Sequence, residues 1–361
     1  MQNNGYQLFV EWLAIGLQEN ASDLHLKVGY KPYIRVSGVL REISNQYVIS
    51  NDLMNEIIDH LITTDLHRET YSQTGSVDMG IVVEKLGYFR INIYRQSGTG
   101  AIVTRLLPIK VPSFETLGLP EVVKNFADFR TGLVIVTGTT GSGKSTTLAS
   151  IINEINKKYN YHIITIEDPI EYRYENNKSI ISQRELGSDC DSFAGALRAA
   201  LREDPDVIFV GEMRDLETIS TVIAAAETGH LVFSTLHTKS ASKTIDRIIS
   251  SFEASQQASV AAQLSTVLKA VVSQQLIPRL DGKGRVCATE ILIVNSAIQN
   301  LIRENKNHQI DSNIQISKNV GMITIEDSLL NLVKQGHITF DEALSRANNP
   351  TYLQNLAQNK R

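Results

Sequence analysis

One short run of residues carries the clearest chemistry in the sequence. It reads Gly138-Thr139-Thr140-Gly141-Ser142-Gly143-Lys144-Ser145, and Thr146 follows it. The glycines allow the backbone to wrap closely around a phosphate and to turn its N–H groups inward. A lysine at this spacing reaches the β- and γ-phosphates, and the serine after it ligates Mg²⁺. The run therefore predicts a site for ATP and Mg²⁺ that extends from Gly138 to Thr146.

Carboxylates follow two of the predicted buried strands, in a group of three after one strand and singly after the other. The first is Glu167, Asp168 and Glu171, and the second is Glu212, which closes the strand that Asp206 opens. Because ligands of open α/β sheets gather at the carboxyl ends of the strands, both groups are expected near the phosphate loop. A carboxylate there can orient Mg²⁺ through its waters or polarise the attacking water, and Glu212 is our candidate for both roles. The commonest form of this motif ends in Asp, and the alternative for the first group is a solvated turn.

Histidines flank a further predicted strand, Leu231–Thr235. His237 follows its carboxyl end, where it could sense a γ-phosphate, and it is a candidate site residue. For His230, which precedes the strand, a functional role and a structural role at a helix end or in the core both stay open. No further ligands lie nearby at a metal-site spacing, so these histidines do not predict a zinc site.

Phosphoryl transfer also needs positive charge against the γ-phosphate, often supplied by a neighbouring subunit. The candidates are Arg198, Arg202, Arg214 and Arg247. The alternative for each of them is an ordinary solvated position on a helix, and the sequence leaves both open.

The elements that must position these residues form a repeated pattern of strand, turn and helix. The strands, apolar on both faces, are expected at Leu133–Thr137, Ile163–Ile166, Val207–Val210 and Leu231–Thr235, and a helix at Ser145–Ile155. Such runs indicate a parallel sheet covered on both sides. From about residue 295 the pattern is helical, with helices expected at Ala297–Arg303, Ile325–Lys334 and Phe340–Ala347.

The first hundred residues mix helical and strand patterns and predict a small α+β domain. Helices are expected over 6–19 and near Leu53–Ile62, and strands at Asp23–Val28, Tyr33–Ile43, Val77–Glu84, Tyr88–Tyr94 and Ile102–Leu106. Prolines and a glycine over Pro108–Pro120 indicate a linker. We therefore expect an α/β protein with an N-terminal domain over 1–107, a linker over 108–120, a P-loop core over 121–294 and a helical region over 295–361.

The composition is that of an ordinary globular protein and argues against several classes. Hydrophobic residues make up 42% and charged residues 20% of the chain, and the formal net charge of −4 gives no basic field for nucleic acid. The two cysteines, Cys190 and Cys287, are far apart and are expected to be reduced thiols. No secretory signal and no membrane-spanning run is visible, so a cytoplasmic protein is expected, one that reaches a membrane only by docking.

Four ordered stretches together resemble the secretion and pilus ATPases, and most closely the type IV pilus retraction (PilT-like) ATPases. They are GTTGSGKSTT, IITIEDPIEY, LREDPDVIFVGEMRDLET and AAETGHLVFSTLHT, which look like the family's Walker A, Asp, Walker B and His boxes. ASDLHL at Ala21–Leu26 and GYFRINIYRQ at Gly87–Gln96 are similar to the family's first domain. The resemblance spans nearly the whole chain.

The resemblance implies a homohexameric motor with a PAS-like N-terminal domain, a RecA-like ATPase domain and a helical C-terminal part. ATP would bind between the two domains, and hydrolysis would rotate one against the other. By position, Glu212, Glu171 and His237 match the family's catalytic residues. The implied partners are other copies of the chain, an inner-membrane pilus platform protein and, indirectly, pilin, with the motor docked at the inner face of the cytoplasmic membrane.

Two features favour retraction over pilus assembly or type II secretion. The chain lacks the four cysteines of the assembly and secretion ATPases' zinc module, and Ser296–Glu304 is similar to the retraction family's AIRNLIRE helix. Gln299 departs from that motif, which has arginine there. The glutamine either alters the coupling between ATP hydrolysis and retraction, marks an accessory retraction paralogue, or simply replaces one polar surface contact. A type II secretion or assembly ATPase, and a nucleotide-gated assembly protein with negligible turnover, stay open as alternatives.

Overall fold

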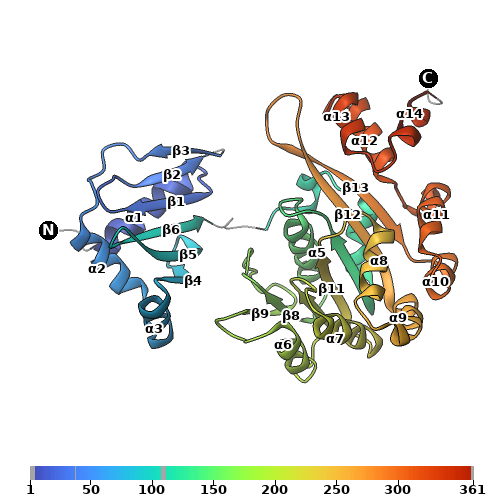
Figure 1. The fold of residues 1–361 in the computed structure, drawn as a ribbon, viewed down its shortest axis with the longest axis horizontal. Helices are drawn as coiled ribbons and strands as arrows, with labels where there is room; N and C mark the ends of the chain where they lie inside the picture. The colour runs from blue at the N-terminus through green and yellow to red at the C-terminus, as the bar shows by residue number, and fades with distance from the viewer. Residues whose placement is uncertain (1–4, 37, 107–110, 359–361) are drawn as a thin grey trace. The chain divides into compact units, whose positions relative to one another are not determined.

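The computed structural model describes residues 5–36, 38–106 and 111–358, and it divides into two compact units. One contains the described residues of Met1–Lys110 with Glu171–Arg173, and the other contains Val111–Ile170 with the described residues of Tyr174–Arg361. Both combine sheet and helix, which confirms the expected mixed α/β fold (Figure 1).

The first unit is built on one antiparallel sheet with the strand order β3-β2-β1-β6-β5-β4. Alternate residues of β5, namely Phe89, Ile91 and Ile93, are buried, as expected when one face of a sheet covers a core. Phe9 and Trp12 of the first helix are fully buried in the same core. The elements are α1 (Gly5–Gln18), β1 (Asp23–Lys27), β2 (Tyr33–Val36), β3 (Val39–Glu42), α2 (Asn51–Leu61), α3 (Asp65–Thr74), β4 (Ser76–Val83), β5 (Gly87–Gln96) and β6 (Thr99–Leu106).

Two details of this unit differ from the sequence-based expectation. The single strand expected over Tyr33–Ile43 is wrong, because β2 and β3 form an antiparallel hairpin and Gly38 at its turn has φ 86°. The helix α3 was not expected, because none of its residues is buried and it therefore has no apolar stripe. Its ends carry the local signals instead, with Thr64 accepting a hydrogen bond from His67 N at 3.2 Å and Gly75 in a left-handed conformation.

The second unit is built on a seven-stranded sheet with the order β13-β12-β7-β11-β10-β8-β9. Every neighbouring pair is parallel except β12 with β13. The four strands expected in this part are confirmed as β7, β8, β10 and β11. The strands are β7 (Gly132–Thr137), β8 (His162–Glu167), β9 (Ile180–Glu185), β10 (Val207–Val210), β11 (Leu231–Leu236), β12 (Leu268–Pro278) and β13 (Arg285–Ile293).

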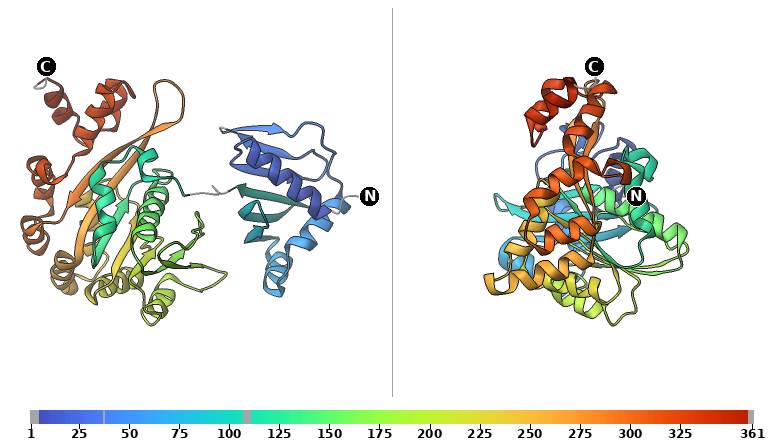
Figure 2. Two further views of the ribbon diagram at one scale, coloured as in Figure 1. Left: turned by 180° about the vertical axis from the view of Figure 1, so that it is seen from behind. Right: turned by 90° about the vertical axis from the view of Figure 1, so that its right-hand side faces the viewer.

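Helices cover both faces of this sheet (Figure 2), which explains why its central strands are apolar on both sides. The helix α5 packs on one face with the short segments that precede β7, and α6 to α11 pack on the other. The helices and short 3-10 segments (η) are η1 (Phe114–Leu117), α4 (Glu121–Lys124), η2 (Asn125–Asp128), α5 (Lys144–Lys158), α6 (Phe193–Ala200), α7 (Leu216–Glu227), α8 (Ala241–Ser250), α9 (Ala254–Val267), α10 (Ser296–Arg303), η3 (Asn307–Gln309), α11 (Ile310–Ile316) and η4 (Lys318–Val320).

Three C-terminal helices gather on the hairpin of β12 and β13 (Figure 1). They are α12 (Ile325–Lys334), α13 (Phe340–Arg346) and α14 (Pro350–Gln358). Their small core contains Ile277 of β12, Leu329 and Leu353, all fully buried. None of the helices within the described ranges has the length and apolar character needed to span a membrane.

Only part of the stretch expected as a linker, 108–120, can be compared with the structure. Residues 108–110 lie outside the described residues. Phe114, by contrast, is 2% exposed and packs in the same core as α5. From Val111 onward this stretch is therefore part of the second unit.

Candidate active site

The phosphate loop joins the buried strand β7 to α5. Gly138 follows β7 with φ 143°, and Gly143 caps α5 with φ 92°. A Cβ at Gly138 would lie 2.4 Å from Gln274 O and 2.5 Å from Ser142 Oγ, so only glycine fits there. The loop is therefore held tightly against β12, with the N-terminus of α5 at its end, which is the form of a phosphate cradle.

Lys144 lies within this loop and is only 9% exposed. Its Nζ donates to Gly138 O at 2.9 Å and to Thr139 O at 3.2 Å. These contacts hold the ammonium group at the loop, where a phosphate would meet it. The hydroxyl of Ser145 at the first turn of α5 and the carboxylate of Glu212 are the hard oxygen donors that Mg²⁺ prefers, so these residues fit the ion chemically.

Hydrogen bonds tie the end of β7 to the end of β11. Thr137 Oγ1 lies 3.0 Å from the carbonyl oxygen of Leu236 and accepts a hydrogen bond from Thr238 N at 2.9 Å. Thr137 is fully buried and directly precedes the phosphate loop, and Leu236 directly precedes His237. The phosphate loop and His237 therefore begin at neighbouring, hydrogen-bonded strand ends.

A second set of hydrogen bonds fixes the backbone around Glu212. Thr235 Oγ1 donates to Gly211 O at 2.6 Å, Met213 N donates to Thr235 O at 3.1 Å, and Gly211 N donates to Ile166 O at 2.8 Å. The segment after β10 is thus clamped between β11 and β8. This clamp fixes the position from which the Glu212 side chain extends.

Four side chains meet at the carboxyl ends of β8, β10 and β11, and we name them the carboxyl-edge cluster: Asp168, Glu212, Arg214 and His237. Glu212 pairs with Arg214, and its Oε2 lies 3.3 Å from His237 Nε2. Arg214 also pairs with Asp168 at 3.2 Å. The hydrogen bond with Glu212, with the nearby charge of Asp168, raises the pKa of the Arg214 guanidinium. The cluster thus contains a carboxylate that can polarise water, a histidine beside it and a cation that orients both acids.

The other candidate residues lie elsewhere. Glu171 belongs by its contacts to the first unit and is not in the cluster. His230 lies at the opposite end of β11, with Nδ1 3.0 Å from Ala225 O, which favours the structural interpretation at a helix end. Arg202 and Arg247 are exposed, and within the described residues neither makes an ion pair.

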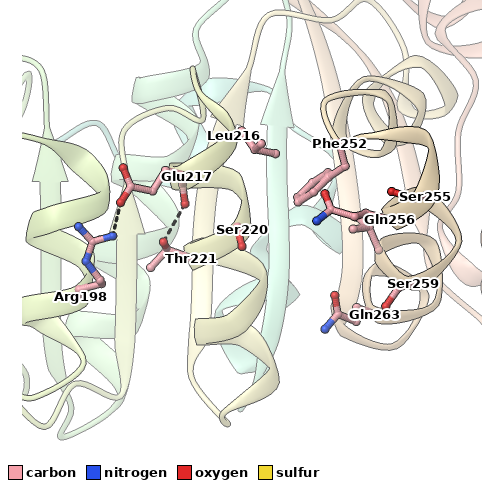
Figure 3. Close-up of a pocket in the computed structure, with 11 residues that line it drawn as sticks. Arg198, Leu216, Glu217, Ser220, Thr221, Phe252, Ser255, Gln256, Ser259 and Gln263 are labelled. Atoms are coloured by element: carbon pink, nitrogen blue, oxygen red, sulfur yellow. Dashed lines mark hydrogen bonds and ion pairs between the residues drawn. The ribbon is translucent and has the colours of Figure 1, made fainter.

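Arg198 lies in a surface hollow of about 800 Å³ between α7 and α9 (Figure 3). Figure 3 shows its guanidinium group directed at Glu217, with which it forms an ion pair. No residue of the phosphate loop or of the carboxyl-edge cluster lines this hollow. Within its own chain, Arg198 therefore pairs with Glu217 and does not contact the candidate site.

Sequence reasoning singled out Glu171 from the acidic loop, whereas the structure brings Asp168 into the cluster. The available signal was position, since Asp168 directly follows the end of β8 and Glu171 lies further along the loop. The sequence could not predict that Arg214 pairs with two carboxylates. Its only indication was that Arg214 lies two residues after Glu212. Gln274, whose backbone abuts Gly138, lies far from the loop in sequence and could not be found from it.

Comparison with known proteins places this arrangement in a family. The family model described as "Type II/IV secretion system protein" matches residues 7–345. The chain is 46% identical over 340 residues to the type IV pilus retraction ATPase PilT of Pseudomonas aeruginosa, covering 94% of this chain and 98% of that protein. It is 48% identical over 318 residues to a twitching motility protein of Neisseria gonorrhoeae, covering 88% and 84% of the two chains.

A solved structure agrees with these relatives. The crystal structure of the pilus retraction motor PilT with bound ADP superimposes with a TM-score of 0.89 at 46% identity, and the match covers 96% of this chain and 98% of that one. On the family model and these relatives, the chain belongs to the type II/IV secretion system protein family.

Proposed function

We propose that this chain is an ATP hydrolase that powers the retraction of type IV pili. The observation that carries the proposal is the meeting of Glu212 and His237, 3.3 Å apart, at strand ends that are hydrogen-bonded to the end of the phosphate-loop strand. The relatives named as retraction and twitching proteins, similar over most of the chain, support pilus retraction as the work that hydrolysis performs.

Binding would use the loop from Gly138 to Thr146. Its backbone N–H groups and the N-terminus of α5 receive the phosphates, and Lys144 Nζ exchanges the carbonyl oxygens of Gly138 and Thr139 for phosphate oxygens. Ser145, and Glu212 through water, would hold Mg²⁺, which when bound would supply positive charge against the phosphates.

Hydrolysis would centre on the Glu212 carboxylate. Glu212 orients the attacking water and accepts its proton, while His237 senses the γ-phosphate. Arg214 holds the carboxylate of Glu212 in place. Glu171 completes the proposed catalytic set, and Arg202 and Arg247 are the arginine candidates without a carboxylate partner among the described residues.

The domain assignment follows the same proposal. Residues 1–107 form a PAS-like domain, supported by the single antiparallel sheet with helices. Residues 121–294 form a RecA-like core, supported by a largely parallel sheet covered on both faces with the phosphate loop after β7. Residues 295–361 form the helical part.

The assembly and its place in the cell are proposed with the function. Six copies form a ring in the cytoplasm, docked at the inner face of the cytoplasmic membrane on a pilus platform protein. Pilin is moved indirectly through that protein. The similarity to a solved pilus retraction motor over nearly the whole chain supports pili as the structures on which this assembly acts.

The test measures phosphate release by the purified protein with ATP and Mg²⁺. Glu212→Gln keeps the shape of the side chain and removes the carboxylate, so turnover should fall by about 10²- to 10⁴-fold. Glu19→Gln, which alters an exposed glutamate paired with Arg41 in the first unit, is the matched control. Turnover of Glu212→Gln equal to that of the unaltered protein would refute the catalytic assignment.

Pilus retraction is tested separately in cells. A strain lacking the gene should extend labelled pili without retracting them, and the unaltered gene should restore retraction while the Glu212→Gln gene should not. Normal retraction in the deletion strain would overturn the proposed cargo and leave the ATPase assignment in place.

A further inference from the structure

The short segment between β11 and α8, residues 237–240, begins with His237. The side chain of His237 is 51% exposed, so packing holds it only in part, yet its Nε2 lies 3.3 Å from Glu212 Oε2. We infer that Thr244 of α8 is the positioning residue for His237 and that it acts through Thr238. The inference rests on the proposed hydrolysis and adds what fixes the histidine within it.

A chain of three threonine hydroxyls runs from the phosphate-loop strand to α8. Thr238 Oγ1 lies 2.6 Å from Thr137 Oγ1 of β7 and also 2.6 Å from Thr244 Oγ1 of α8. Thr137 and Thr244 are both fully buried. A hydroxyl can donate one hydrogen bond and accept two, so Thr238 can bond to both neighbours at once. The residue directly after His237 is therefore held between a strand and a helix.

The contact with Thr244 adds a second attachment point for Thr238. Thr137 Oγ1 already contacts the backbone of Thr238, at N over 2.9 Å and at O over 2.9 Å. These contacts attach Thr238 to β7 alone and leave rotation about that attachment open. A bond to a different element, α8, removes this rotation, and with it a movement that would carry the adjoining His237 away from Glu212.

Thr244 is well suited to act as a fixed point. Its Oγ1 donates to Ser240 O at 2.8 Å, and its side chain is on the buried side of α8 with Ile245 and Ile248. A helical threonine that bonds the carbonyl four residues before it is restricted in χ1, so the direction of its hydroxyl is set by the helix. The hydroxyl that meets Thr238 is therefore placed by α8 and not by the segment that it holds.

The other end of the segment is attached to different strands. Ser273 Oγ of β12 donates to Lys239 O at 3.0 Å, and Ala241 N donates to the Glu290 carboxylate of β13 at 2.7 Å. Both contacts lie further from His237 along the chain than those of Thr238. They fix where α8 begins and leave the control of the histidine to Thr238.

Small movements of His237 should matter for the reaction. A separation of 3.3 Å from Glu212 is at the long end for a hydrogen bond, so a small shift decides whether the contact is kept. A misplacement of about 1 Å in a catalytic arrangement can cost about 10²-fold in rate. Within the described residues, the hydroxyl of Thr244 bonds Thr238 and Ser240 and no residue of the phosphate loop. We therefore expect Thr244 to affect the rate of hydrolysis and not the binding of ATP.

The experiment measures phosphate release by the full chain over a range of ATP concentrations with Mg²⁺. Thr244→Val replaces the hydroxyl by a methyl group of similar size, and Thr244→Ser keeps the hydroxyl. Thr238→Val removes the middle hydroxyl and serves as the second test if Thr244→Val does not fold, which thermal unfolding reports. Ser265→Ala is the matched control, because it removes an equally buried hydroxyl that donates to Ala262 O within α9 at 2.7 Å.

Thr244→Val and Thr238→Val should each lower kcat about tenfold and change the KM for ATP by less than about twofold. Thr244→Ser should keep most of the rate, and Ser265→Ala should keep all of it. The decisive comparison uses His237→Ala, which should itself be slow. In that background Thr244→Val should cost less than about twofold, because its effect passes through the histidine that is no longer there.

An unchanged kcat in both valine variants would overturn the inference and leave the ATPase assignment in place. A tenfold loss that is the same with and without His237 would also overturn it, since Thr244 would then support the fold in general. A His237→Ala variant as fast as the unaltered protein would remove the proposed role of the histidine, and the inference with it. If the unaltered protein released no phosphate, the proposed function would fail together with the inference.

Discussion

Two glycines of the phosphate loop should respond very differently to the same substitution. Gly138 and Gly141 both have positive φ, 143° and 77°. A Cβ at Gly138 would lie 2.4 Å from the backbone oxygen of Gln274, whereas a Cβ at Gly141 would meet nothing within 4 Å. Gly138→Ala and Gly141→Ala therefore separate the cost of a collision from the cost of the backbone conformation.

The magnitudes follow from these contacts. Gly141→Ala adds only the strain of a left-handed alanine, about 1–2 kcal/mol. Gly138→Ala adds similar strain and a collision with a strand backbone that cannot rotate away, for a total of about 2–5 kcal/mol. Because the loop or β12 must shift to relieve the collision, ATP affinity should also fall by more than about tenfold in Gly138→Ala.

The stability assay is denaturant unfolding followed by far-UV circular dichroism. Fluorescence is less suitable, because the only tryptophan, Trp12, is buried in the first unit and both glycines are in the second. ATP affinity is measured by calorimetry. Equal losses of stability in the two variants would refute the argument, because they would mean that the contact with Gln274 O carries no cost.

Three further substitutions test separate parts of the structure. Arg214→Gln should lower stability by less than about 1 kcal/mol, because the Arg214 side chain is 58% exposed, but should reduce phosphate release about tenfold by releasing Glu212, and Arg214→Lys should restore part of the rate. Thr137→Val should cost about 1–3 kcal/mol in the free energy of unfolding, because it removes a fully buried hydroxyl that accepts a hydrogen bond from the half-buried Thr238 N. Burial raises the pKa of Glu290 from 4.5 to about 8, so the folded protein prefers its neutral form and loses stability as the pH rises from about 4.5 to 8. Glu290→Gln should therefore stabilise the protein increasingly over this range in unfolding experiments, and a difference independent of pH would contradict this.

Local patterns in the sequence predict much of the second unit. The strands β7, β8, β10 and β11 are mostly apolar runs, and the phosphate loop has a fixed pattern of residue types. Both signals are contained in a few consecutive residues. The positions of Glu212 and His237 at strand ends follow directly, since parallel strands share one carboxyl edge.

The remainder depends on contacts between distant residues. β12 is late in the chain yet pairs with β7, so no local pattern shows that Gln274 abuts Gly138. Arg214 is indistinguishable by sequence from an arginine that contacts phosphate. Residues 345–348 line a cavity beside the phosphate loop only because α13 packs against the β12–β13 hairpin, which no local pattern shows.

The hydroxyl groups of two threonines connect three adjacent strand ends. Thr137 joins the end of β7 to β11, and Thr235 joins β11 to the residue that follows β10. A shift of Thr137 itself would be passed to the segments that lead into His237 and Glu212, because hydrogen bonds join Thr137 to Leu236 and Thr235 to Gly211. A substitution at either threonine is therefore expected to disturb the phosphate loop and the carboxyl-edge cluster together, rather than one of them alone.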